Sequence, residues 1–182
     1  MIDSSLLPLS SDQIRLRPLE HKDAKAFAGG SADPLVREYA HLPQPNYTTD
    51  SVMKMIREEA NPGLERGDLA VLAIADLNDS FAGSLVLFNV TDDGAEVGFW
   101  LHPNFRGVGL SRSAVELAAQ LAVGSGLDRL FARTAVGNIA SQRVLAQADF
   151  AEINRSTDIA PSGETLGLVH FQRDLQARPH NP

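Results

Sequence analysis

Cysteine is absent from the 182-residue chain. Disulfides, thiolate nucleophiles and cysteine-based zinc sites are therefore excluded, and the composition agrees with a reducing compartment. Long apolar runs are missing too, because no stretch approaches the roughly 18 residues of a membrane helix. The segment Met1–Ser5 lacks the basic start of a signal peptide. We therefore expect a cytoplasmic protein with no membrane partner.

Basic residues are outnumbered, with 16 Lys and Arg against 23 Asp and Glu and a net charge of -7. An acidic chain repels nucleic acid and anionic membranes, so we expect neither as a partner. A cationic amine would be attracted, although the same charge also serves solubility alone. The five histidines are scattered without ligand spacing, so we expect no metal site.

The length and the 43% share of hydrophobic residues predict one folded domain. We expect residues 1–12 to form a loose leader, 13–175 the domain and 176–182 a flexible tail. Alternation and turn residues predict strands at 13–19, 68–77, 81–91, 95–101, 127–135, 150–159 and 164–174. Apolar periodicity and caps predict helices at 21–28, from 34 onward, and at 49–65, 112–123 and 138–148. This order is mixed α/β (α+β), and helix 112–123 should join two neighbouring parallel strands by a right-handed crossover.

A glycine loop, Arg106–Ser111, lies between one predicted strand and the helix that follows it. Gly107 and Gly109 permit positive φ, so backbone N–H groups can point at a phosphate or pyrophosphate at the helix N-terminus. Arg106 can pair with a phosphate oxygen. A dinucleotide fingerprint would need glycine at Arg112, and the Gly-Lys-Ser/Thr of a P-loop is absent. A plain strand-to-helix turn is the alternative.

Several pieces of the chain resemble the Gcn5-related N-acetyltransferase (GNAT) superfamily. Residues 103–111 resemble its acyl-CoA pyrophosphate loop, with the Gln/Arg-x-x-Gly-x-Gly/Ala pattern falling on Arg106, Gly109 and Ser111. Residues 138–150 are similar to its second signature, and 96–101 to its fourth strand. The opening at 14–19 resembles the RimJ/RimL-like branch. The pieces occur in the family's order over about residues 13–174.

The resemblance implies a mixed, mostly antiparallel central sheet with helices on both faces and a splayed parallel strand pair. It also implies acetyl-CoA as the acyl donor, with pantetheine wedged between strands 95–101 and 127–135. The implied cofactor-binding residues are Trp100, Leu101, Arg106, Gly107, Val108, Gly109, Leu110, Ser111 and Asn138.

The chain departs from the family pattern at several positions. Val108 stands where a basic residue is common, and Ser111 where a smaller one is usual. Asp149 replaces the glycine of the second signature, although Asp tolerates the left-handed conformation. The tyrosine that many relatives carry after that signature is missing, because Tyr39 and Tyr47 lie far upstream. We expect weaker cofactor binding at worst.

Two residues are the catalytic candidates that the resemblance implies. Glu96 would take the amine proton through water, with an ion pair or a solvated position as the alternative. Ser141 would donate a hydrogen bond to the thioester sulfur, with helix capping or surface exposure as the alternative. Asn138 would cap the helix, bond pantetheine, or do both.

The predicted function is transfer of an acetyl group from acetyl-CoA to a primary amine. The acceptor is a protein N-terminus, an aminoacyl conjugate or a small-molecule amine, bound by residues 33–60 and the final hairpin. Three alternatives remain open: a non-catalytic or regulatory acyl-CoA-binding module, a transferase of a larger acyl group such as succinyl, and a plain interaction domain. The sequence also leaves open whether the protein forms a homodimer.

Overall fold

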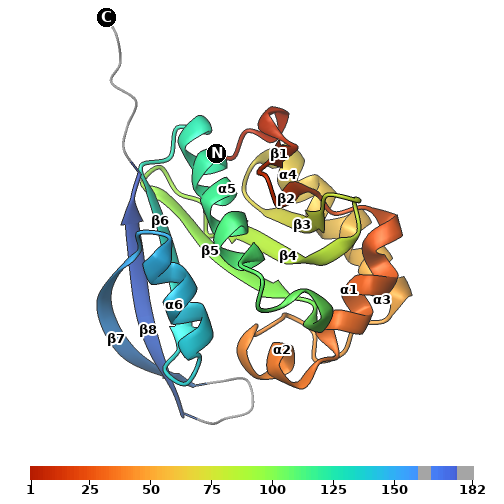
Figure 1. The fold of residues 1–182 in the computed structure, drawn as a ribbon. Helices are drawn as coiled ribbons and strands as arrows, with labels where there is room; N and C mark the ends of the chain where they lie inside the picture. The colour runs from red at the N-terminus through yellow and green to blue at the C-terminus, as the bar shows by residue number, and fades with distance from the viewer. Residues whose placement is uncertain (160–164, 176–182) are drawn as a thin grey trace, which may run out of the picture.

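The computed structural model describes residues 1–159 and 165–175, so the tail expected at 176–182 lies outside the described residues. Its strands form one sheet in the order β1-β2-β3-β4-β5-β6-β8-β7 (Figure 1). Within the described residues, β5 and β6 are the one parallel pair. The strands are β1 (Leu9–Ser10), β2 (Ile14–Pro18), β3 (Ala70–Asp76), β4 (Phe81–Phe88), β5 (Gly94–Leu101), β6 (Arg129–Ala135), β7 (Ala151–Ile159) and β8 (Thr165–Asp174).

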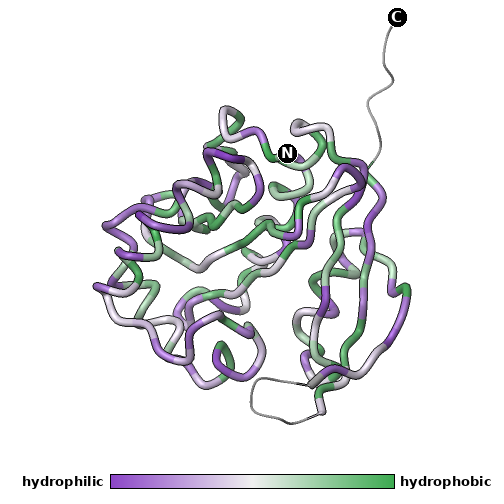
Figure 2. Tube along the Cα trace, turned by 180° about the vertical axis from the view of Figure 1, so that it is seen from behind, coloured by the Kyte–Doolittle hydropathy of each residue, from purple (hydrophilic) through white to green (hydrophobic). Residues whose placement is uncertain are grey.

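Six α-helices in the described part of the chain cover the two faces of the sheet (Figure 1). They are α1 (Ala24–Ser31), α2 (Pro34–Tyr39), α3 (Thr49–Met55), α4 (Asn61–Arg66), α5 (Leu110–Gly124) and α6 (Ile139–Gln147). The larger core packs α5 and α6 against one face, and the smaller packs α1, α2 and α3 against the other. Figure 2 shows hydrophobic residues along the central strands and hydrophilic ones on the outer turns. The predicted mixed fold is confirmed.

Two segments differ from the sequence-based expectation. Residues 1–12 are packed rather than loose: Ile2 is buried, and β1 pairs with β2. Apolar side chains near the start, such as Leu6 and Leu9, cover the larger core and hold this segment in place. The helical run predicted at 49–65 is present, but it is interrupted by a π-helical turn, Ile56–Ala60, which precedes Pro62 and changes the hydrogen-bond register.

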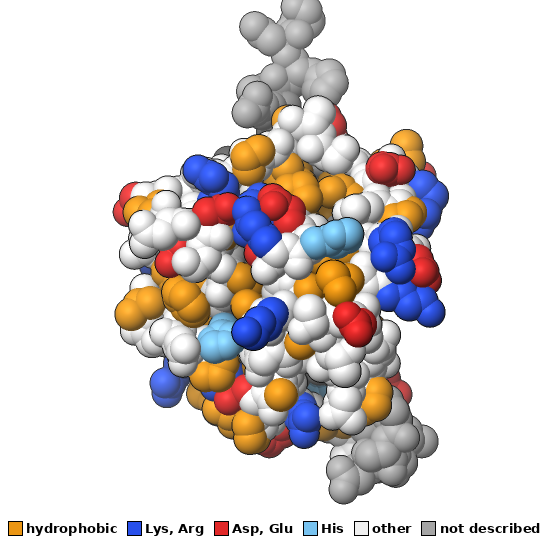
Figure 3. Space-filling model, turned by 90° about the vertical axis from the view of Figure 1, so that its right-hand side faces the viewer, with side chains coloured by type: hydrophobic (Ala, Val, Ile, Leu, Met, Phe, Trp, Pro, Cys, Tyr) orange, Lys and Arg blue, Asp and Glu red, His pale blue; other side chains and the backbone are white. Residues whose placement is uncertain are grey.

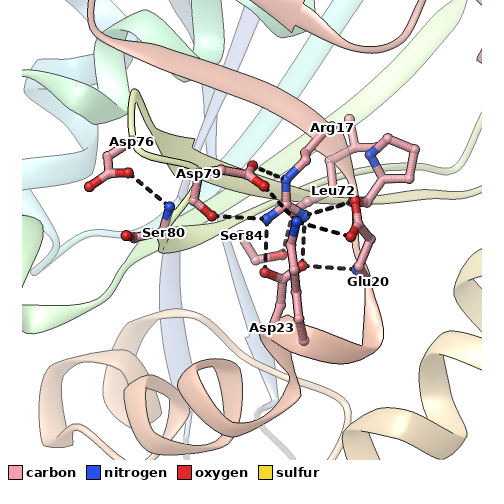
Figure 4. Close-up of polar contacts among 10 residues, drawn as sticks. Arg17, Glu20, Asp23, Leu72, Asp76, Asp79, Ser80 and Ser84 are labelled. Atoms are coloured by element: carbon pink, nitrogen blue, oxygen red, sulfur yellow. Dashed lines mark hydrogen bonds and ion pairs between the residues drawn. The ribbon is translucent and has the colours of Figure 1, made fainter.

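A buried ion cluster joins β2 to α1 and to the β3–β4 turn (Figure 4). The Arg17 guanidinium, 5% exposed, donates to both carboxylate oxygens of Asp23 at 2.7 and 2.9 Å and to Asp79 at 2.7 Å. Hydrogen bonds from Lys22 and Arg17 lower the pKa of Asp79 to about 2. Because the charge of Arg17 is buried, the cluster supports the fold only while its acidic partners stay ionised.

Acidic and basic side chains alternate on the side that carries α1 and α3 (Figure 3). Apolar side chains lie between them, and no continuous patch of acidic or of basic side chains extends over this side. The net negative charge is therefore not gathered there as a broad attractive surface for cations. Within residues 1–159 and 165–175, no helix is both long and apolar enough to cross a bilayer.

Candidate active site

The glycine loop adopts the backbone conformation that its glycines predict. Gly107 has φ +83° and Gly109 has φ +85°, both in the left-handed region. Gly109 is the N-cap of α5, and a β-carbon on Gly107 would meet no atom within 4 Å. Val108 is 61% exposed at the tip of the loop. The loop is thus open to solvent where a ligand would approach.

Unpaired backbone donors gather where the loop enters α5. In the described part of the chain, the N–H groups of Val108, Gly109, Leu110 and Ser111 have no hydrogen-bond acceptor. Leu110 buries its side chain in the larger core, so the helix start is anchored while its amides stay free. The positive end of the 15-residue helix adds to their effect. This arrangement suits a phosphate or pyrophosphate.

Arg106 is engaged differently from the sequence-based expectation. Its Nη2 donates to Asp33 Oδ1 at 2.6 Å and to the carbonyl of Leu101 at 3.3 Å. Asp33 also caps α2 by accepting from the N–H groups at its start, and the Arg106 guanidinium lowers the pKa of Asp33. Arg106 therefore ties the loop to α2, and its contact with a phosphate stays a prediction.

Strands β5 and β6 separate part-way along their length. Their parallel ladder runs from Gly94–Arg129 to Glu96–Phe131 and ends there. The rest of β5 and the rest of β6 diverge and leave facing backbone groups unpaired. The expected splayed pair is confirmed, and it forms a wedge that opens toward the N-termini of α5 and α6 (Figure 1). We call this end of the wedge its mouth.

One buried hydroxyl on β6 lacks a partner near this wedge. Thr134 is 6% exposed, and its Oγ1 accepts or donates no hydrogen bond within the described residues. Buried polar groups are nearly always paired in folded proteins. A polar ligand or an ordered water in the wedge would supply the missing partner.

Trp100 and Leu101 present their side chains to the two cores rather than to the wedge. Trp100 is 8% exposed and packs edge-on against Phe27 at 5.1 Å. Leu101 belongs to the larger core. Because neighbouring strand residues point to opposite faces, only their backbones remain for a cofactor. The sequence could not decide this, since aromatic residues serve cores and pockets alike.

Glu96 lies at the last paired position of the β5–β6 ladder. Its carboxylate, 13% exposed, accepts from Arg133 Nε at 2.8 Å and Nη2 at 3.1 Å. Asn89 also donates to it at 3.1 Å, and this carboxylate raises the pKa of Arg133. The ion pair named as an alternative is therefore present, at the point where the strands separate. The sequence analysis did not single out Arg133, because its register against Glu96 depends on the tertiary fold.

The second signature forms the start of α6 beside the mouth. Asn138 Oδ1 accepts from the N–H of Ser141 at 3.1 Å, so Asn138 is the helix N-cap. The Ser141 hydroxyl is half-buried and has no hydrogen-bond partner within the described residues. Asp149 adopts φ +59°, the left-handed conformation expected there. The capping role of Asn138 is confirmed, and the chemical roles of Asn138 and Ser141 stay predictions.

A shallow groove beside the glycine loop was not anticipated from the sequence. It has a volume of about 500 Å³ and follows α5 past Gly109, Arg112 and Glu116. Gln13, at the start of β2, accepts a hydrogen bond from the Ser113 hydroxyl at 2.9 Å across its floor. No group of three potential metal ligands occurs in the part of the chain described.

A comparison with models of protein families identifies the family of the chain. The profile of the acetyltransferase (GNAT) domain matches residues 13–151. The chain belongs to the GNAT acetyltransferase family. It is therefore an acyltransferase, and the sequence-based resemblance is confirmed. The chain has no significant sequence match among curated proteins.

Solved structures share the fold of this acetyltransferase at low sequence identity. RimJ of Mycobacterium smegmatis, solved with CoA-disulfide, has a TM-score of 0.82 at 20% identity, covering 92% of this chain and 85% of its own. The ribosomal-protein-S5-alanine acetyltransferase of Vibrio fischeri has a TM-score of 0.81 at 16% sequence identity, and the match covers 97% of this chain and 100% of the neighbour. Spermidine N-acetyltransferase of Vibrio cholerae, solved with CoA and spermine, has a TM-score of 0.78 at 16% sequence identity, and the match covers 91% of this chain and 98% of the neighbour. At this identity the likeness concerns the fold.

Proposed function

We propose that the protein transfers the acetyl group of acetyl-CoA directly to a primary amine. The observation that carries this proposal is the open wedge between β5 and β6, with free amides at the start of α5. The acceptor is a protein N-terminus, an aminoacyl conjugate or a small-molecule amine. Two structural neighbours are named for the amines they acetylate, an alanine of a ribosomal protein and spermidine, and they support this range.

The residues around the wedge fit the donor. The four free amides of Val108–Ser111 would hold the pyrophosphate. The part of β5 beyond Glu96, which has no ladder to β6, would bond the pantetheine amides, and Asn138 caps α6 beside the mouth. The orphan hydroxyl of Thr134 gives the wedge one more polar group. Bound acetyl-CoA supplies an activated acetyl thioester.

Glu96 and Ser141 are the residues to which we assign the chemistry. Glu96 would take the proton of the attacking amine through a water molecule, since its Oε1 keeps a lone pair beyond the bond from Arg133, whereas its Oε2 accepts from both Arg133 and Asn89. Ser141, with its unpaired hydroxyl in the first turn of α6, would donate to the sulfur. The same ion pair would keep Glu96 oriented toward the opening.

Release of free thiol from acetyl-CoA in the presence of a panel of amines tests the proposal. The panel includes a peptide with a free N-terminus, a polyamine and an aminoacyl ester. Amine-dependent release is expected for at least one class. Binding of CoA without any release would favour a non-catalytic acyl-CoA-binding module. A larger rise in melting temperature with succinyl-CoA than with acetyl-CoA would favour a larger acyl group.

A further inference from the structure

Three half-buried apolar side chains on β4 and β6 belong to neither core. They are Val86, Phe88 and Phe131. Phe88 on β4 pairs with Glu96 on β5, and Glu96 pairs in turn with Phe131 on β6. Val86 pairs with Gly98, two positions further along β5. Paired residues of neighbouring strands point to the same side of a sheet, so the three side chains lie around the carboxylate of Glu96. We call them the apolar patch.

The apolar patch lies on the side of the sheet that carries α1 and α3. Trp100, two positions after Gly98, points to the same side and packs against Phe27 in the smaller core. Val71, which pairs with Val86 on β4, also packs against that core. The patch therefore continues the apolar surface of the smaller core up to the point where β5 and β6 separate.

The donor and the acceptor reach Glu96 from opposite sides of the sheet. The glycine loop begins α5, and α5 packs in the larger core with Ala95 and Val97 of β5. Because side chains alternate along a strand, Glu96 points away from α5. A donor whose pyrophosphate lies at the start of α5 enters the wedge from that side. An amine that gives its proton to Glu96 through water must then lie on the other side, over the apolar patch.

We infer that the acceptor is a primary amine attached to an apolar body, an inference that rests on the proposed function. The amino group lies at Glu96, and the body covers Phe88, Phe131 and Val86. Contact removes apolar surface of both the ligand and the patch from water, which favours binding. A hydrophilic amine would instead lose hydration of its polar groups against side chains that cannot hydrogen-bond.

Gly98 lowers the surface of the sheet beside the carboxylate. A β-carbon at this position would stand 3.2 Å from Val86 Cγ1 and 3.8 Å from Phe88 Cε1. A side chain here would therefore occupy the space next to the patch, and glycine leaves that space to a ligand. The same chemistry is offered by a free arylalkyl amine and by a peptide whose first residue is apolar.

The test measures kcat/KM for matched amines at saturating acetyl-CoA. Phenethylamine and ethanolamine form the free pair, and two peptides that differ only in a first residue of Phe or Ser form the peptide pair. Spermidine is the extended, cationic comparison. The wild-type protein should prefer the apolar member of at least one pair by about 30-fold or more, and should prefer it to spermidine as well. The pair that shows the preference identifies the source of the amine.

Two valine variants test whether the apolar patch causes this preference. Val86→Thr keeps the shape of the side chain but places a hydroxyl in the patch, so it should reduce the preference about five-fold, through a higher KM for the apolar amine. Val123→Thr makes the same change on α5, against the larger core, and should keep the wild-type preference. CoA affinity should be unchanged in both variants.

The possible failures are distinguishable. Equal or faster turnover of ethanolamine, the Ser peptide or spermidine would overturn the apolar acceptor and leave the proposed function standing. An equal loss of preference in the two valine variants would do the same. Faster turnover with butyryl-CoA than with acetyl-CoA, without a preference among amines, would assign the patch to the acyl group and also overturn the inference. If the protein binds CoA but releases no thiol with any amine, the proposed function itself fails.

Discussion

Gly109 and Gly126 occupy the two ends of α5 with nearly the same positive φ. Gly109 has φ +85° at the N-terminus and Gly126 has φ +78° just past the C-terminus. Alanine at either position should cost about 1 kcal/mol of stability, because its β-carbon disfavours the left-handed region. Gly109→Ala should in addition weaken CoA binding roughly ten-fold by turning the loop amides away.

Calorimetry with CoA and thermal unfolding of the two variants check this prediction. Gly126→Ala is the control, because it carries the same backbone strain at the other end of the helix. Equal CoA affinity in both variants would show that the loop amides do not hold the ligand.

Glu96 and Arg133 allow the role of the carboxylate to be separated from the role of the ion pair. Glu96→Gln keeps the shape of the side chain but cannot take a proton, so turnover should fall about 100-fold with CoA affinity unchanged. Arg133→Gln removes the partner and leaves the carboxylate, and should slow turnover much less. Steady-state rates and CoA titrations measure both, and an equal loss in both variants would make the pair structural.

The conformation of single residues could be predicted where it depends on their neighbours in the sequence. The positive φ of Gly107 and Gly109, the left-handed Asp149 and the Asn138 cap all depend on neighbours in sequence. The partner of Arg106 could not be predicted, because Asp33 lies 73 residues away along the chain.

At the scale of elements, α2 lies between the glycine loop, which it meets through Asp33, and the turn after β6, which it approaches through Tyr39. Asp33→Ala removes the helix cap and releases Arg106. Thr48→Ala removes the cap of α3, away from the mouth. Both should lose about 1 kcal/mol of stability. Only Asp33→Ala should also lower turnover several-fold, because α2 loses its link to the glycine loop beside the wedge, while CoA affinity does not fall.

Unfolding curves and rates at saturating CoA test this coupling. The same turnover in Asp33→Ala and Thr48→Ala would mean that α2 is a passive part of the fold. A fall of CoA affinity in Asp33→Ala would instead show that Arg106 needs Asp33 to shape the loop.

Most elements follow from the periodicity of the chain, and their ends depend on packing. The three-strand meander β3–β5 and helices α5 and α6 lie within a few residues of their predicted ranges. The π-helical turn before Pro62 was beyond prediction, because it depends on how α3 packs in the smaller core. The packing of residues 1–12 against the domain was not predicted either, because their apolar side chains contact residues far along the chain.

At the scale of the whole molecule, the Arg17 cluster joins elements from the first half of the chain. Asp23→Asn removes the buried one of the charges that balance the Arg17 guanidinium and should lower the free energy of unfolding by about 3 kcal/mol. Asp68→Asn breaks an ion pair with Arg66 whose side chains are 61% and 55% exposed, and should change it little. Urea titrations of both variants measure the free energy of unfolding. Equal losses would contradict a larger contribution from the buried Arg17–Asp23 pair than from the exposed Arg66–Asp68 pair.

The order of strands in the sheet could be predicted from the sequence only in part. A right-handed crossover through α5 predicted that β5 and β6 are parallel neighbours, and they are. The insertion of β8 between β6 and β7 could not be derived, because the final hairpin can pair with the sheet through either strand.

Transfer of an isotope-labelled acetyl group from acetyl-CoA to an amine tests the central claim most directly. The protein is incubated with labelled acetyl-CoA and the panel of amines, and the products are analysed by mass spectrometry. We expect one amine class to gain the mass of a single labelled acetyl group on nitrogen, together with one free thiol for each group transferred. Binding of acetyl-CoA with no labelled amine in any class would contradict the assignment as an N-acetyltransferase.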